Sequence, residues 1–223
     1  MGRCSDARDR LLATASLLLH ERGYTAVSVA DICNAAGLKK GSFYHFFRSK
    51  HALVLATLDR FAEHQEMGMQ AAMAGNRPSR EQLVGMVTAM YAGYVRAQRS
   101  FGSAHGCPLG NLAQEMAHRD ADIRAKLETI FKRWESQIAQ MLQSADARGE
   151  LAVPDAKRAA EAIIAFIQGA TLLAKTNNDP EVFLRLAHGA VVLAQADLPT
   201  AAAPPVVLEE ECTNACQTAE SLQ

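Results

Sequence analysis

Gly and Pro residues divide this chain of 223 residues into stretches in which apolar side chains recur every three or four positions. In residues 5–22, for example, Leu11, Ala15 and Leu18 follow this spacing, and Gly23 comes directly after the stretch. The spacing places apolar side chains on one face of an α-helix, and a Gly after the last of them is typical of a helix C-terminus. No window shows the repeated alternation of β-branched residues that strands need. The sequence therefore predicts an all-α fold.

The same signals predict about nine helices along the chain. Ser28 with Asp31 three residues later has the pattern of a capping box, Pro154 and Pro180 suit first turns, and Gly149 suits a C-terminus. The expected helices cover about 5–22, 28–36, 39–46, 49–65 or beyond, 79–100, 107–118, 120–148, 154–176 and 180–196.

The segment 35–53, AAGLKKGSFYHFFRSKHAL, places four aromatic residues within positions 43–47 and basic residues on both sides of them. Two short helices joined by a tight turn, the second beginning with lysines, are the pattern of a helix-turn-helix. On a helix that starts near Lys39, Phe43 and Phe46 or Phe47 lie three or four residues apart and share an inward face. We therefore expect the phenylalanines to form a core and the polar residues of the segment to face outward.

The outward residues have the chemistry of DNA contact. Ser42 and His45 are short or flat enough to meet base edges, and Gly41 permits close approach of the helix. Phosphates or guanine acceptors are in reach of three longer side chains, Lys39, Lys40 and Tyr44. Lys50 belongs to the first turn of the next helix, where a phosphate would meet its ammonium and free backbone N–H groups.

Charge is distributed unevenly along the chain, although the formal net charge is only −1. Residues 1–60 contain nine Lys or Arg and five Asp or Glu, a net charge of +4, whereas residues 61–223 contain 14 and 19, a net charge of −5. A basic head on an acidic body indicates a nucleic-acid-binding module attached to a second domain.

About 45 residues in order, 8–53, resemble the DNA-binding head of the TetR/AcrR family of transcriptional repressors. The residues that carry the resemblance are Gly23, Tyr24, Ser28, Ile32, Ala36, Gly37, Gly41, Ser42, Tyr44, Phe47 and Lys50. The resemblance implies phosphate contacts from Ser28, Tyr44 and Lys50, and it presents Lys39, Lys40, Gly41, Ser42 and His45 to the major groove. The chain departs from the family pattern where Cys33 replaces the usual Ala and where Ala30 stands in place of the base-reading Arg of some members.

The resemblance also implies three regions: a helix-turn-helix domain at 1–50, a helical effector-binding and dimerisation domain at 51–198, and the remaining residues. Residues 199–223 contain four Glu and no Lys or Arg, and we expect them to form a disordered acidic tail.

The resemblance further implies a homodimer that pairs through its last two helices. Such a dimer requires a pseudo-palindromic double-stranded DNA operator. The sequence supports such pairing because AAEAIIAFIQGATLLAK is apolar almost all round, but both helices filling a monomer core is the alternative. The expected interface residues are Ile163, Phe166, Ile167, Ala170, Leu173, Phe183, Leu186, Ala190 and Val191.

The segment HGCPLGNLAQEMAHRDADIR resembles a TetR subgroup that includes the regulator of N-ethylmaleimide reductase and acrylate-responsive repressors. Cys107 stands at an expected helix N-terminus beside His105, which favours the thiolate and predicts a lowered pKa. A repressor that senses electrophiles or redox state through this thiol is therefore an alternative function, and an unreactive capping thiol is the other reading of Cys107. The residues expected to bind or sense a small-molecule effector are Cys107, Asn111, Glu115, Met90, Tyr94 and Trp134.

Two other classes of function compete with this hypothesis. Glu115 and His118 match one Glu-x-x-His pair of a di-iron enzyme, but no second pair follows, and His105 with Cys107 lacks an orienting third group. We therefore expect no enzyme, cofactor or metal. A DNA-binding dimer without ligand sensing is the second alternative.

Because no stretch approaches about 18 consecutive apolar residues and the start of the sequence lacks the apolar segment of a signal peptide, we expect a cytoplasmic protein without a membrane partner.

Overall fold

The computed structural model describes residues 2–73 and 77–198, and within these ranges the chain has ten α-helices and no strand. The helices are α1 (Gly2–Arg22), α2 (Val29–Ala35), α3 (Lys40–Phe46), α4 (Lys50–Met73), α5 (Ser79–Phe101), α6 (Pro108–Met116), α7 (Ala121–Ala147), α8 (Ala156–Thr176), α9 (Val182–Leu186) and α10 (Gly189–Gln195). The predicted all-α fold is confirmed. The acidic tail expected at 199–223 lies outside the described residues.

One boundary differs from the sequence prediction in a way that affects packing. The single helix expected at 180–196 is divided into α9 and α10 by a turn at Ala187 and His188. Gly189, which opens α10, lies directly against the Phe166 ring of α8, where a Cβ atom would come within 2.6 Å of ring carbon Cζ. The chain thus turns directly before a close contact with α8, and only Gly fits there without displacing the ring.

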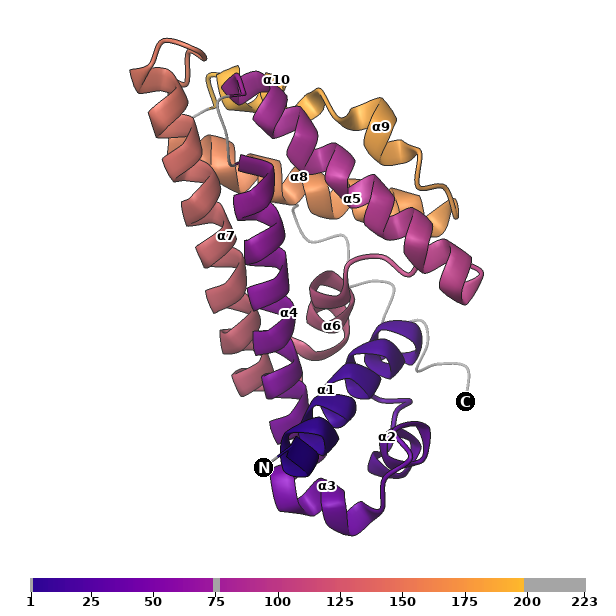
Figure 1. Cartoon of the computed structure of the whole chain (residues 1–223). Helices are drawn as coiled ribbons and strands as arrows, with labels where there is room; N and C mark the ends of the chain where they lie inside the picture. Colours follow the sequence, from indigo (N-terminus) through magenta and orange to yellow (C-terminus); the bar gives the residue numbers. More distant parts are fainter. Residues whose placement is uncertain (1, 74–76, 199–223) are drawn as a thin grey trace, which may run out of the picture.

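The head consists of α1, α2 and α3 around a small apolar core (Figure 1). Ser28 caps α2 as predicted: its hydroxyl accepts from the Asp31 N–H at 3.1 Å while the Asp31 carboxylate accepts from the Ser28 N–H at 2.8 Å. Phe43 is fully buried and Phe47 nearly so, which confirms that these rings are core. The polar residues of α3 are left on the outside of this core.

The body is built on two long helices, α4 and α7, that run side by side and extend upward from the head (Figure 1). Helix α8 crosses behind them and packs most extensively against α7, and α5, α9 and α10 cover the upper part. Helix α6 is short and lies between the head and this upper part. It therefore contacts both α1 and α7 and is placed to connect the two regions.

Most of the expected dimer residues belong to the core of the single chain. The structure corrects this prediction for Ile163, Ile167, Ala170, Phe183, Ala190 and Val191, all of which are buried among α5, α7, α8, α9 and α10. Phe166 and Leu186 are half-buried, and only Leu173 is exposed. The large apolar side chains that remain exposed on α8, α9 and α10 are Leu172, Leu173, Leu184 and Val192.

Helix α8 is also the one helix in the described ranges that is long and apolar enough to cross a membrane. Its Ile163 and Ala174 are fully buried, and it packs against α7 on one side and α10 on another. These contacts are those of a core helix, whose apolar composition follows from burial on more than one face.

Candidate functional site

The outer surface of α3 carries the polar residues that the sequence predicted to face DNA. Lys39, Lys40, Tyr44 and His45 are exposed, and Tyr44 keeps 57% of its surface accessible. Beneath them, the Phe43 ring meets Tyr44 edge to face with their centroids 5.2 Å apart. The buried ring thus fixes the helix that presents the basic residues.

Two residues predicted to contact phosphate have their polar atoms hydrogen-bonded to other groups of the head. The Ser28 hydroxyl donates to the Asp31 carboxylate at 2.5 Å in addition to its capping role. The Lys50 ammonium donates to the carbonyl oxygens of Tyr24 at 2.9 Å and Val27 at 2.8 Å, and it lies 4.0 Å from the centre of the Tyr24 ring. In this structure Ser28 therefore stabilises α2, and Lys50 stabilises the turn that precedes α2.

The carboxylate of Glu115 joins the body to the head. It was expected to bind an effector, but its two oxygens accept the backbone N–H groups of Tyr24 and Thr25, each at 2.7 Å. Burial alone would raise the pKa of Glu115, but hydrogen bonds from Thr25 and Tyr24 hold it below its usual value. Gly23 adopts a positive φ of 81°, and a Cβ there would lie 2.7 Å from the Glu115 carboxylate. Glycine is thus required where α6 meets the end of α1. The hydrogen bonds of Glu115 hold α6 against the turn that follows α1.

A cavity of about 450 Å³ lies within the body and brings together four of the expected effector residues. Met90 and Tyr94 come from α5, Cys107 from the N-terminus of α6, and Trp134 from α7. The volume is within the range of about 300–1,000 Å³ typical of small-molecule sites.

Sequence reasoning missed many of the other residues that line this cavity, including two polar side chains, His20 and Gln168. His20 reaches it from α1 of the head, and its Nε2 lies 2.8 Å from the carbonyl oxygen of Gly106. Gln168 reaches it from α8. No local signal identifies either residue, because the partners in the cavity are separated from them by long stretches of sequence.

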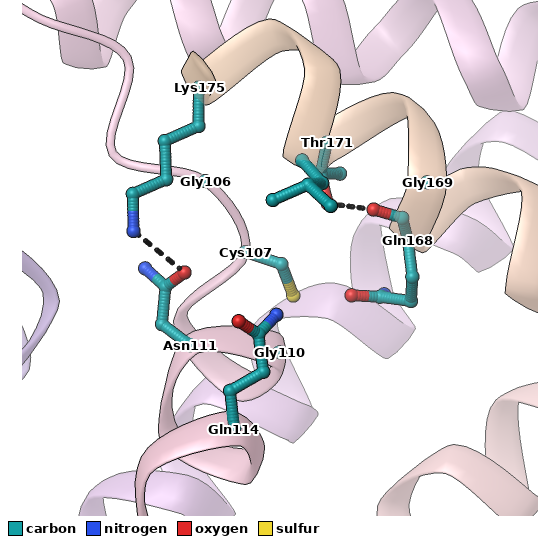
Figure 2. A pocket seen from close by; sticks show the side chains of 10 residues that line it. Gly106, Cys107, Gly110, Asn111, Gln114, Gln168, Gly169, Thr171 and Lys175 are labelled. Atoms are coloured by element: carbon teal, nitrogen blue, oxygen red, sulfur yellow. Dashed lines mark hydrogen bonds between the residues drawn. The ribbon is translucent and has the colours of Figure 1, made fainter. Parts of the chain in front are cut away.

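A smaller cavity of about 210 Å³ lies against the same cysteine (Figure 2). The Cys107 thiol points between the side-chain amides of Gln114 and Gln168. Asn111, another expected effector residue, lines this smaller cavity, where its Oδ1 accepts from the Lys175 ammonium at 3.2 Å and its Nδ2 donates to the His105 carbonyl at 2.6 Å. Asn111 is therefore tied to the loop before α6 and does not line the larger cavity.

The thiol of Cys107 differs from its sequence prediction. Burial raises its pKa above the ordinary value of a cysteine, and this effect exceeds the opposing hydrogen bonds from the backbone of Gly110 and Leu109 and from Gln168. The predicted lowering of the pKa by the helix N-terminus is thus wrong, because the thiol is removed from water. At neutral pH the group is a thiol and not a thiolate.

We expect Cys107 to react slowly with alkylating reagents in the folded protein. At pH 7.5 the rate of iodoacetamide modification, followed by peptide mass spectrometry, should be at least about tenfold lower than in the same protein unfolded in urea, because only the thiolate reacts. The rate should still be rising between pH 8 and pH 9, since the raised pKa leaves the group largely protonated there. Equal rates in the folded and unfolded protein would contradict this expectation.

Comparison with known proteins identifies the family of this chain. Residues 11–57 match the family model described as bacterial regulatory proteins, tetR family, and residues 84–190 match that of the tetracyclin repressor-like C-terminal domain. The chain belongs to the TetR family. The first match covers the head, and the second covers most of α5 to α10, so both parts of a TetR-family regulator are present.

Several known proteins are similar to this TetR-family chain in sequence or in structure. It is 35% identical over 190 residues to the transcriptional regulator AcuR of Cereibacter sphaeroides, covering 81% of this chain and 84% of that protein. It is 28% identical over 140 residues to the transcriptional repressor NemR of Escherichia coli, covering 62% of this chain and 68% of NemR. The crystal structure of a regulatory protein TetR from Rhodobacter sphaeroides superposes with a TM-score of 0.75 at 32% identity, covering 82% of this chain and 98% of that one. The chain is thus a DNA-binding transcriptional regulator and not an enzyme.

Proposed function

We propose that the chain is a homodimeric transcriptional repressor that binds a pseudo-palindromic operator and is released by a small-molecule effector. The observation that carries the proposal is the exposed basic and aromatic surface of α3 above the buried Phe43, on a head of the TetR family. The proposed DNA contacts are Lys39, Lys40, Gly41, Ser42, Tyr44 and His45. A cytoplasmic location follows from this role.

The exposed apolar residues of the C-terminal helices are the proposed dimer interface. Leu172 and Leu173 on α8, Leu184 on α9 and Val192 on α10 keep between 44% and 67% of their surfaces exposed. Exposed aliphatic side chains on the outside of a packed core are candidates for an association surface. A two-fold dimer formed there would bring two heads to two half-sites of one operator.

The proposed effector site is the larger cavity, and α6 is the proposed connection to the DNA. Cys107 at the start of α6 lines the cavity, and Glu115 near its end holds the turn that precedes α2. An effector that binds better to a second arrangement of α6 would change the position of the head and weaken DNA binding by its differential affinity for the two states. The boundaries predicted near residues 50 and 198 would then separate the DNA-binding head from the effector-binding body, and the body from the C-terminal residues.

Lysine substitutions test the proposed DNA surface. The operator is first selected from random double-stranded DNA with the full chain, and its affinity is then measured over a range of salt concentrations. Lys40→Ala should lower the salt slope of the dimer by about two units, roughly one for each head, because a phosphate contact releases counterions. Lys50→Ala should lower the slope by less than half as much, since the Lys50 ammonium is held by two carbonyl oxygens.

Lys157→Ala is the matched control, because Lys157 is exposed on α8 of the body. It should leave both affinity and slope unchanged. A slope that Lys40→Ala does not alter would exclude the proposed role of α3 in contacting DNA.

A further inference from the structure

A third cavity, the joint cavity, lies where the head meets the body and has a volume of about 170 Å³. Three helices enclose it: α1 of the head, α4 of the body, and α6 between the two regions (Figure 1). His20, Phe61 and Pro108 line both this cavity and the larger one, so the two are neighbours. None of the described residues that line the joint cavity belongs to α5, α7 or α8, however, so it is a separate place in the fold.

The wall of the joint cavity is mainly apolar. Buried side chains of two helices form much of it: Val54 and Leu58 of α4, and Leu109 and Leu112 of α6. Leu17 of α1 also lines it and keeps 53% of its surface exposed. The joint cavity is therefore an apolar space that reaches solvent at Leu17.

Most polar side chains that line the joint cavity have hydrogen bonds within the chain. The Thr57 hydroxyl donates to the carbonyl oxygen of Leu53 at 2.9 Å. His20, Asn111 and Glu115 have the partners described above. A polar ligand that entered would lose its hydrogen bonds to water and find few groups to replace them. The lining therefore favours a ligand without polar atoms.

The volume of the joint cavity suits a single small ring. In another protein, an engineered cavity of about 150 Å³ lined by Leu, Ile and Phe stays dry and binds benzene. The joint cavity has a similar volume and a similar aliphatic and aromatic lining. Empty apolar space costs stability in proportion to its volume, so a molecule that fills the space stabilises the arrangement of helices around it.

We infer that the joint cavity binds a neutral hydrocarbon of one ring, such as benzene, at a site separate from the proposed effector cavity. The bound ring contacts α1, α4 and α6 together. Because it binds only while these three helices enclose it, it stabilises the observed position of the head against the body. Binding at this site does not depend on the proposed effector role of the larger cavity.

Benzene and pyridine, measured by calorimetry on the full chain without DNA, test the class of ligand. The two rings have nearly the same shape, and both are uncharged at neutral pH. Benzene should bind saturably and at least about tenfold more tightly, because the pyridine nitrogen loses its hydrogen bond to water inside the cavity. Benzylammonium should bind no more tightly than pyridine, since the Glu115 carboxylate is already held by two backbone N–H groups.

Two leucine substitutions locate the ring. Ser16→Leu places an aliphatic side chain in the joint cavity and should weaken benzene binding at least about tenfold, since it occupies the same space. Gly93→Leu fills part of the larger cavity and should leave benzene binding unchanged. Ser136→Leu, at an exposed position of α7, is the matched control for the serine substitution. Thermal unfolding of each variant checks that the fold is retained.

Hydrogen exchange of the wild-type protein tests the effect on the joint without any substitution. At a benzene concentration about ten times its Kd, amides of α6 and of the turn after α1 that exchange when the joint opens should exchange about tenfold more slowly, because the ring binds only the closed form. Amides of α9 and α10, which pack in the core of the body, should be unaffected.

The inference is overturned if benzene does not bind saturably, or if pyridine or benzylammonium binds as tightly as benzene. It is also overturned if Gly93→Leu and not Ser16→Leu removes binding, because the ring would then occupy the larger cavity. Unchanged exchange at the joint with benzene bound would exclude the stabilising effect on the head. Since neither DNA nor an effector is present, none of these outcomes bears on operator binding by α3 or on its release.

Discussion

Val192→Glu should leave the protein monomeric at micromolar concentration and weaken operator binding at least about 100-fold. Val192 is the most exposed large apolar residue in the described part of the chain, with 67% of its surface accessible, and it lies on α10 beside α8. A carboxylate at the centre of an apolar interface loses its hydration without gaining a partner, which costs several kcal/mol. Loss of the dimer removes the second half-site contact, so each head binds DNA alone.

The control for this substitution is Met67→Glu on α4. Met67 is 59% exposed, so the change introduces the same charge at a comparably exposed apolar position away from the proposed interface. Sedimentation equilibrium should find a dimer for the wild type and for Met67→Glu, and a monomer for Val192→Glu. If Val192→Glu remained dimeric, the proposed pairing through α8, α9 and α10 would be wrong.

The helices and the core of the head could be predicted from sequence because both depend on neighbouring residues. The spacing of apolar residues in α1 and the capping box of Ser28 and Asp31 act within a few positions, and the structure retains both. Burial of Phe43 beside the exposed Tyr44 follows from the same helical period. The helical period therefore predicted that the Phe43 ring lies in the core and that the Tyr44 ring faces outward.

The proposed dimer surface could not be predicted from the same period. Apolar composition does not distinguish a side chain buried in its own chain from one left exposed on the surface, and α8 has both kinds, as Ile163 and Leu172 show. The role of Glu115 was missed because its partners Tyr24 and Thr25 lie about 90 residues earlier. For Cys107, the helix N-terminus was visible in the sequence, but the burial that outweighs it depends on the tertiary fold.

Phe43→Ala should unfold the head while leaving the body folded. Phe43 is fully buried at the centre of the head core, and truncation of such a ring costs about 3–5 kcal/mol. A head of about fifty residues has a free energy of unfolding of roughly 3–8 kcal/mol, at about 0.05–0.15 kcal/mol per residue. The substitution therefore removes most of the stability of α1 to α3, and operator binding should be lost with it.

Hydrogen exchange measured by mass spectrometry separates this effect from a lost DNA contact. In Phe43→Ala, amides of α1, α2 and α3 should exchange at least about 100-fold faster, while those of α8 and of the part of α7 from Ile138 onward, which pack in a separate core, keep their protection. Tyr44→Ala is the matched control at the next position: because its ring is largely exposed, exchange should stay near the wild-type rate although operator affinity falls. Slow exchange in the head of Phe43→Ala would mean that the contacts of Glu115 and Lys50, and not the aromatic core, hold the head together.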